Sequence, residues 1–560
     1  MNGAPDAPLR AATDAATDAA SIELSLISHT NAGKTTLART LLGRDVGEVR
    51  DAAHVTATAD AYAMIETPQG DVLRLWDTPG FGDSVRLARR LAQQGNPIGW
   101  FLSTVWDRWR DRPFWSSQQA VRNVREEADV VLYLVNASED PQDAGYVEPE
   151  LQILEWIGRP VIALLNQVGP PRPREQEEAD AARWRTALRA RPFVRDVLSL
   201  DAFARCWVQE GALLRAVGAA LAADKQPAHA RLVAAWQHRR IEQFDTSIAL
   251  LAAQLAEAAC DREAVPEGAP LRDALTRAGR ALGLGAPRLS PKAPDPADAP
   301  ASPADAARAR AMKALAARLD AGIRDSTDRL IVVHGLEGRA AAEVLDRVAD
   351  AYASDAPVPE GKAAMVGGFL SGALSGLAAD IASGGLSFGA GMLTGGVLGA
   401  LGAAGLARGI NLVQGRGEPA VRWSEAYLDG LVEAALLRYL AVAHYGRGRG
   451  QWSRSESPPH WRDAVTAALA PRRQRITAAW ALRTEARGDA DLLDDADPQS
   501  VADAPPPPRG RDGAPSCATL TADALRAPLR EAAVALLESL YPEAAPFSGR
   551  APSTAEGETR

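Results

Sequence analysis

A short apolar segment that leads into a polar, glycine-containing loop constrains this chain more than any other feature. Residues 22–27 are of strand length, residues 28–36 read SHTNAGKTT, and a run of helix-forming residues follows. A strand, a loop and a helix in this order are typical of a phosphate-binding P-loop. In that loop Gly33 gives the backbone room to approach a phosphate, Lys34 reaches the β- and γ-phosphates, and the Thr35 hydroxyl ligates Mg²⁺. The pattern begins with glycine, where this loop has serine, and the phosphate-binding groups are all retained.

A second motif follows a second strand. Apolar and polar residues alternate in segment 61–66, a turn follows at 68–70, and segment 72–76 is largely apolar, so a hairpin of two strands is predicted. The second segment is followed directly by Asp77-Thr-Pro-Gly80. In P-loop proteins an aspartate at this point holds Mg²⁺, usually through water, and the following glycine offers its N–H to the γ-phosphate. The two motifs together predict a nucleoside-triphosphate-binding domain.

The remaining strands and helices of this region alternate. Apolar runs at 129–136, 160–165 and 193–200 are separated by helical stretches at 147–157 and 174–190. This order predicts an α/β fold, a P-loop NTPase domain with a mostly parallel sheet wrapped by helices and the ligand at the carboxyl ends of the strands. A tryptophan-rich insertion around residues 100–115 is interpreted as a helical pair packed on the domain, with a partner-binding surface as the alternative.

Residues 21 to about 225 resemble a small GTPase of the translation-factor-related class, the Era and TrmE group. Asn31 lies where that group has asparagine in its P-loop, residues 77–80 match its second signature, and Thr58 has the spacing of its switch threonine, with Thr56 as the alternative. The segment 158–166 and the glycine-rich region near 365–412 resemble a bacterial subfamily with a C-terminal domain of unknown function.

The resemblance implies a set of functional residues. A guanine nucleotide, GTP or GDP, is expected to contact Asn31, Ala32, Gly33, Lys34, Thr35, Thr36, Asp77, Gly80 and Asn166. Mg²⁺ is expected near Thr35, Thr58 and Asp77, and the residues expected to act in hydrolysis are Lys34, Thr58 and Gly80. By the same resemblance, K⁺ is a further expected cofactor, acting through Asn31.

Two positions depart from the family pattern. The guanine-reading motif Asn-Lys-x-Asp is here Asn166-Gln-Val-Gly169, so the carboxylate that accepts from the base is missing. Because a charge-assisted hydrogen bond contributes about 1.5–3 kcal/mol, the sequence predicts weaker discrimination between GTP and ATP. Phe81 lies where Ras-type enzymes have the glutamine that orients water, which predicts slow hydrolysis.

The remainder of the chain predicts an all-α C-terminal region with a glycine-rich hydrophobic hairpin. The expected organisation is a disordered lead-in at 1–20, a GTPase domain at 21–225, a helical region with a Pro/Ala-rich linker at 226–362, the hairpin at 363–412, a second helical region at 413–486, and a partly disordered tail with one helix at 487–560.

The hairpin segment has an unusual pattern. Residues 381–407 carry no charge, and glycines recur every fourth residue, at Gly368, Gly372, Gly376, Gly391, Gly395 and Gly399. This glycine-zipper spacing allows close helix contact in lipid, and the run is long enough to span a bilayer. We predict membrane insertion or attachment, with a tightly packed soluble hairpin as the alternative.

Charge and cysteine content limit the remaining possibilities. A net charge of −9 argues against nucleic acid as a partner. Cys206, Cys260 and Cys517 fit no metal spacing and are expected to be free thiols in a reducing compartment. No secretory signal is recognised at the N-terminus, so a cytoplasmic location is predicted, with association with the inner, cytoplasmic membrane.

The function predicted from these features is a slowly hydrolysing GTP switch. Its C-terminal helical domain is expected to engage a membrane, a protein partner or a second copy of the chain. Two alternatives stay open: a nucleotide-binding scaffold with degenerate catalysis, and a dynamin-like membrane-remodelling GTPase, which needs nucleotide-dependent self-assembly.

Overall fold

The computed structural model describes a defined part of the chain. The described residues are 19–30, 32–43, 59–104, 106, 111–168, 174–189, 191–202, 206–265, 303–336, 410–413, 420–444, 460–485 and 516–542. Asn31, Thr56, Thr58 and Gly169 lie outside these ranges, as does the predicted hairpin up to residue 409.

The chain divides into two compact units. Unit 1 comprises residues up to Gly169 together with 175–202 and 210–239, and unit 2 comprises 170–174, 203–209 and everything from Arg240 onward. The division therefore falls inside helix α8 (Gln226–Cys260).

Unit 1 contains a six-stranded, mostly parallel sheet. Its strand order is β2-β3-β1-β4-β5-β6, and only β2 is antiparallel to its neighbour. The strands are β1 (Ser21–Ser28), β2 (Asp60–Glu66), β3 (Val72–Asp77), β4 (Val130–Asn136), β5 (Val161–Asn166) and β6 (Val194–Ser199). The predicted α/β fold of this region, a mostly parallel sheet wrapped by helices, is confirmed.

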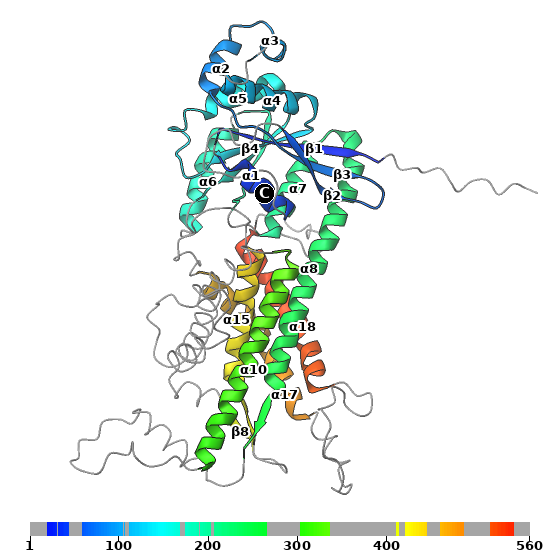
Figure 1. Ribbon diagram of the computed structural model, residues 1–560, viewed down its shortest axis with the longest axis vertical. Helices are drawn as coiled ribbons and strands as arrows, with labels where there is room; N and C mark the ends of the chain where they lie inside the picture. Colours follow the sequence, from blue (N-terminus) through cyan, green and yellow to red (C-terminus); the bar gives the residue numbers. More distant parts are fainter. Residues whose placement is uncertain are drawn as a thin grey trace, which may run out of the picture. The chain divides into compact units, whose positions relative to one another are not determined.

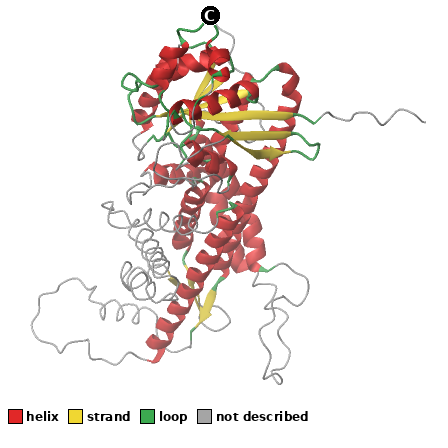
Figure 2. Cartoon of the chain, turned by 45° about the horizontal axis from the view of Figure 1, so that its top comes forward, coloured by secondary structure: helices red, strands yellow, loops and turns green. Residues whose placement is uncertain are grey.

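Helices cover both faces of this sheet (Figures 1 and 2). α1 and α7 lie on one side, and α4 and α5 on the other. The helices that lie between or after these strands in sequence are α1 (Lys34–Leu42), α2 (Ser84–Leu91), α3 (Pro97–Ser103), α4 (Arg112–Glu126), α5 (Val147–Ile157), α6 (Arg174–Arg189) and α7 (Trp207–Ala220). The central strands are apolar throughout because both of their faces are covered, and the first six of the seven residues of β4 are buried.

The tryptophan-rich insertion packs on the domain, as the sequence suggested. It forms α3 and α4, and the Trp106 ring lies with its centroid 6.0 Å from that of Phe101 and 4.8 Å from that of Phe114. Both phenylalanines are buried in the core beneath the helices. These aromatic rings therefore extend the hydrophobic core of unit 1.

A buried ion pair joins the β2–β3 turn to the first part of α8. The fully buried Asp71 carboxylate accepts from Arg231 Nε at 2.6 Å and Nη2 at 2.8 Å, and also from the Ala20 N–H. The bonded Arg231 guanidinium lowers the pKa of Asp71 to about 2. The charged pair therefore stabilises the fold above the ordinary aspartate pKa, and this contribution is lost as the pH falls toward 2.

Unit 2 is helical, as predicted, with a small sheet that the sequence did not predict. Its helices are the second part of α8, α10 (Pro303–Val333), α15 (Glu425–Ala443), α16 (His460–Leu469), α17 (Arg473–Glu485) and α18 (Cys517–Leu540). The antiparallel strands are β7 (Arg262–Ala264), β8 (Ile410–Val413) and β9 (Ala420–Trp423). Strands this short carry too few residues to show a period of two.

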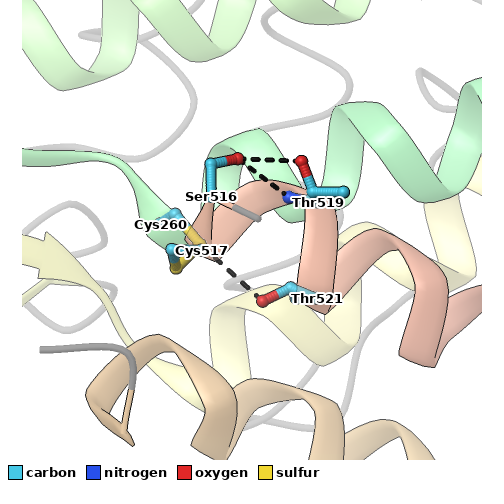
Figure 3. The surroundings of a disulfide bond; sticks show 5 residues. All are labelled: Cys260, Ser516, Cys517, Thr519 and Thr521. Carbon is cyan, nitrogen blue, oxygen red and sulfur yellow. Dashed lines mark hydrogen bonds between the residues drawn. A yellow bond between two sulfur atoms is a disulfide. The ribbon is translucent and has the colours of Figure 1, made fainter. Parts of the chain in front are cut away.

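Two of the three cysteines are paired, which corrects the sequence prediction of free thiols. Cys260 at the end of α8 and Cys517 at the start of α18 form a disulfide, shown in Figure 3. Cys206 is buried and is not part of a disulfide. A separation of 257 residues leaves no spacing signal for such a pair. The predicted cytoplasmic location rested partly on reduced thiols and stays a prediction.

Across the residues that the structure describes, no helix is both long enough and apolar enough to cross a membrane. The predicted glycine-rich hairpin lies outside that part of the chain, apart from its last residues, 410–412, which belong to β8.

Candidate functional site

The P-loop joins the carboxyl end of β1 to the start of α1. Gly33 has φ +86°, a left-handed conformation that L side chains rarely adopt, and a Cβ there would lie 2.8 Å from Asn166 Nδ2. Lys34 Nζ donates to Ser28 Oγ at 2.9 Å and is buried. Burial lowers the pKa of Lys34, and the nearby charges of Asp77 and Glu150 act in the opposite direction. The lysine side chain is thus buried next to Ser28, and the negative charges of Asp77 and Glu150 favour its charged form.

Thr35 and Asp77 form the candidate metal site. Thr35 Oγ1 donates to Asp77 Oδ2 at 2.6 Å. Asp77 is 2% exposed, and its Oδ1 is buried without a hydrogen-bond partner among the described residues. Burial raises the pKa of Asp77, and the negative charge of Asp60 acts in the same direction. A hydroxyl and a carboxylate are the hard oxygen ligands that Mg²⁺ takes, so these residues fit the ion.

The second motif lies directly against the P-loop. The Phe81 N–H donates to the Ser28 carbonyl at 2.9 Å, and Thr30 Oγ1 donates to the Phe81 carbonyl at 2.7 Å. A Cβ on Gly80 would lie 2.9 Å from Lys34 Nζ and 3.1 Å from the Thr30 Cα, so a side chain here would crowd the P-loop. The Phe81 side chain is fully buried in the core and therefore cannot orient a water molecule.

Asn166, at the end of β5, connects two loops. Its Nδ2 donates to the Ala32 carbonyl of the P-loop at 2.9 Å, and its Oδ1 accepts from the Ala202 N–H at 2.9 Å. Gln167 follows with φ +56°, a conformation uncommon for a residue other than glycine. Asn166, the residue predicted to contact the base, therefore holds the P-loop and the loop after β6 together.

The structure brings together predicted residues from three separate motifs. The P-loop supplies Gly33, Lys34 and Thr35, the second motif supplies Asp77 and Gly80, and β5 supplies Asn166. Ala32 and Thr36 are buried on either side of this group, at the end of the loop and in the first turn of α1. Asn31 and the alternative switch residues Thr56 and Thr58 fall in parts of the chain that are not described.

Sequence reasoning missed a buried network behind the P-loop. His29 Nδ1 lies 2.8 Å from Glu150 Oε1, and the Tyr133 hydroxyl donates to Glu150 Oε2 at 2.9 Å. Burial raises the pKa of Glu150, and the hydrogen bonds from His29 and Tyr133 act in the opposite direction. The His29 ring also stacks on Tyr146, with centroids 4.6 Å apart. In sequence Glu150 resembles an ordinary acidic residue in the first turn of a helix, so nothing pointed to it.

Comparisons with known proteins agree with this site. Residues 23–167 match the family model described as 50S ribosome-binding GTPase, and residues 353–502 match a domain family of unknown function. The first match spans the P-loop, the second motif and Asn166, and it supports guanine-nucleotide binding. A comparison with curated proteins found no match.

Solved structures of GTP-binding proteins resemble part of the chain. A point variant of Era from Aquifex aeolicus bound to GDP and AlF4⁻ is 18% identical with a TM-score of 0.24, and Era with MgGDPNP and a segment of 16S ribosomal RNA is 18% identical with a TM-score of 0.25. Each match covers 32% of this chain and 51% of the Era chain, so the chain spans about half the length of Era. A probable GTP-binding protein, EngB, is 13% identical over 32% of this chain and 88% of its own, with a TM-score of 0.19.

Proposed function

We propose, from the premise that residues 23–167 are a small GTPase domain, that the chain is a molecular switch. It binds GTP together with Mg²⁺ and hydrolyses the GTP slowly. The interactions of its C-terminal domain depend on which nucleotide is bound.

The arrangement of Lys34, Thr35 and Asp77 carries this proposal. These side chains come from two motifs that are 42 residues apart in sequence, yet Thr35 and Asp77 are hydrogen-bonded and Lys34 is buried close to Asp77. Thr35 and Asp77 would hold Mg²⁺, which would offset the negative charge that develops on the phosphates during transfer. Lys34 is expected to bind these phosphates, and the Gly80 N–H is expected to donate to the γ-phosphate. The close approach of Gly80 to Lys34 Nζ supports this assignment.

Slow hydrolysis is the first prediction. Because Phe81 is buried and offers no polar group, we expect turnover well below about 1 s⁻¹, the lower end of typical enzyme values. By resemblance to the Era and TrmE group, K⁺ acting through Asn31 is expected to stimulate the reaction. A steady-state phosphate-release assay in Na⁺ and in K⁺ tests both points. Rapid turnover in Na⁺ alone would show that another group orients the water.

The β2–β3 hairpin is a route by which a nucleotide signal reaches α8. It connects the segment of Thr56 and Thr58 to residues 77–83, the two loops proposed to order around the γ-phosphate. Asp71, which lies in the turn between β2 and β3, binds Arg231 of α8. We therefore assign this hairpin the role of a mechanical link within unit 1.

The partner of the C-terminal domain is proposed to be the cytoplasmic membrane, on the strength of the uncharged segment 381–407. We expect the full chain to sediment with membranes, and a chain lacking 363–412 to stay in the supernatant. Cell fractionation without detergent measures this. If the full chain stays soluble, the membrane proposal is wrong, and Gly372→Leu and Gly395→Leu should then destabilise a packed soluble hairpin instead.

Two other functions give different results in these assays. A scaffold with degenerate catalysis binds GTP and releases no phosphate in either salt. A dynamin-like protein assembles into larger particles when GTP is added, which light scattering detects.

A further inference from the structure

A second loop reaches the place where the base-reading carboxylate is missing. β5 and β6 are parallel neighbours, so the loops after them, residues 166–168 and 200–202, leave the same edge of the sheet. The Leu200 N–H donates to the Leu165 carbonyl at 3.0 Å, which holds the two loops together.

The loop after β6 carries an acidic residue at this junction. Asp201 Oδ2 accepts from the Val168 N–H at 3.0 Å, and the next residue, Ala202, donates to Asn166 Oδ1 at 2.9 Å. Val168 directly precedes Gly169, where the family motif has its aspartate. A carboxylate from elsewhere in the chain therefore binds the residue that directly precedes, in sequence, the position where the motif carboxylate is absent.

The Asp201 carboxylate is held inside the domain by the loop that carries it. Its side chain is in a residue that is 8% exposed, and the Val168 N–H fixes one of its oxygens. A carboxylate fixed in this way can accept hydrogen bonds from a ligand without first rearranging. Asn166 connects the same loop to the Ala32 carbonyl of the P-loop, so the carboxylate lies in the group of residues expected to surround the nucleotide.

We propose that Asp201 is the carboxylate that recognises guanine in this protein. This inference rests on the proposed function, since it assumes a nucleotide in the P-loop. Guanine presents its N1–H and its 2-amino group on one edge, and an acceptor-only carboxylate binds both donors. Adenine has neither donor at these positions, so a site built around the carboxylate rejects it. The protein then distinguishes GTP from ATP despite its altered motif.

Asp201→Asn tests the assignment because it exchanges one acceptor for a donor. The asparagine oxygen still accepts from the Val168 N–H, so the loop stays attached. Xanthine has a carbonyl oxygen where guanine has its 2-amino group, and an asparagine amide donates to that oxygen. We therefore expect the variant to bind GDP about 10- to 100-fold more weakly than the parent and to bind xanthosine diphosphate more tightly than GDP.

The measurement is calorimetric titration of the full-length chain with GDP, ADP and xanthosine diphosphate in the presence of Mg²⁺. The parent should prefer GDP over ADP by at least about tenfold. Asp224→Asn is the matched control, because Asp224 is an exposed aspartate of unit 1 in the short 3-10 helix Ala223–Lys225, and it should leave all three affinities unchanged.

The outcomes separate this inference from the proposed function. If Asp201→Asn binds GDP as the parent does, or loses GDP without gaining xanthosine diphosphate, Asp201 does not contact the base and the inference is wrong. If the parent binds GDP and ADP equally, guanine recognition by Asp201 is also refuted, while the nucleotide switch stands. If the parent binds no nucleotide, the proposed function itself fails.

Discussion

The Lys34→Ala variant is expected to lose GTP binding by about 10²- to 10⁴-fold. In the P-loop pattern this lysine meets both the β- and the γ-phosphate, and each charge-assisted hydrogen bond contributes about 1.5–3 kcal/mol. Lys34 is buried in this structure, so its ammonium group has already lost much of its hydration and gains strongly from an anionic ligand. The measurement is calorimetric titration with GTP and Mg²⁺.

A control separates the role of this residue from a general loss of positive charge. Arg195→Ala removes an exposed cation near the amino end of β6, at the opposite edge of the sheet from the P-loop, and should leave GTP affinity unchanged. Because Lys34→Ala removes a positive charge near the buried Asp77 and Glu150, its thermal midpoint should fall, and a cooperative melt without nucleotide establishes that the variant is folded at the titration temperature. Equal GTP affinity of the lysine variant and the parent would show that the P-loop assignment is wrong.

The sheet and most of the site were predictable because local patterns determine them. The apolar run at 130–135 is buried on both faces, as a central parallel strand must be, and the polar motifs follow directly where the strands end. Parallel strands bring their carboxyl ends to one edge, so Lys34 and Asp77 had to lie near each other once both strands were recognised.

Residues that act across loops without a motif were not predictable. Asp201 follows a strand as any polar loop residue does, and only the paired geometry of β5 and β6 brings it to Val168. Glu150 lies on a helix 121 residues from His29, its partner in the P-loop. Both carboxylates stand out from other acidic residues because they are buried. Burial depends on the folded chain and cannot be read from the residues next to them in sequence.

The helices of unit 2 were predicted by their composition, but their alignment was not. Asp245 on α8 binds Arg530 on α18 at 2.7 Å, and Cys260 is bonded to Cys517 (Figure 3). Between these two contacts the residue number increases along α8, from 245 to 260, and decreases along α18, from 530 to 517. The two helices are therefore antiparallel, and at a rise of about 1.5 Å per residue the two contacts are about 20 Å apart. Contacts between segments more than 250 residues apart leave no trace in a single sequence.

Removing the disulfide is expected to lower the free energy of unfolding of unit 2 by about 2–5 kcal/mol. The bond closes a loop of 257 residues, and so long a loop loses much entropy when its ends are joined in the unfolded chain. The corresponding fall in the thermal midpoint is on the order of 10 °C. Hydrogen exchange should speed up most in α18 and in the part of α8 near Cys260, because these segments lose their covalent connection.

Thiol titration and a reductant control distinguish the bond from a mere contact between two thiols. In denaturant without reductant the chain should show one reactive thiol, Cys206, and after reduction three. Reductant should lower the midpoint of the parent but leave that of the Cys260→Ser/Cys517→Ser double variant unchanged, since that variant has no bond to break. Three thiols before reduction, or an equal response of both proteins, would mean that α8 and α18 are held by packing and by noncovalent contacts such as the Arg530–Asp245 pair. In that case the original expectation of free thiols would be restored, and with it the support that the cysteines gave to a reducing compartment.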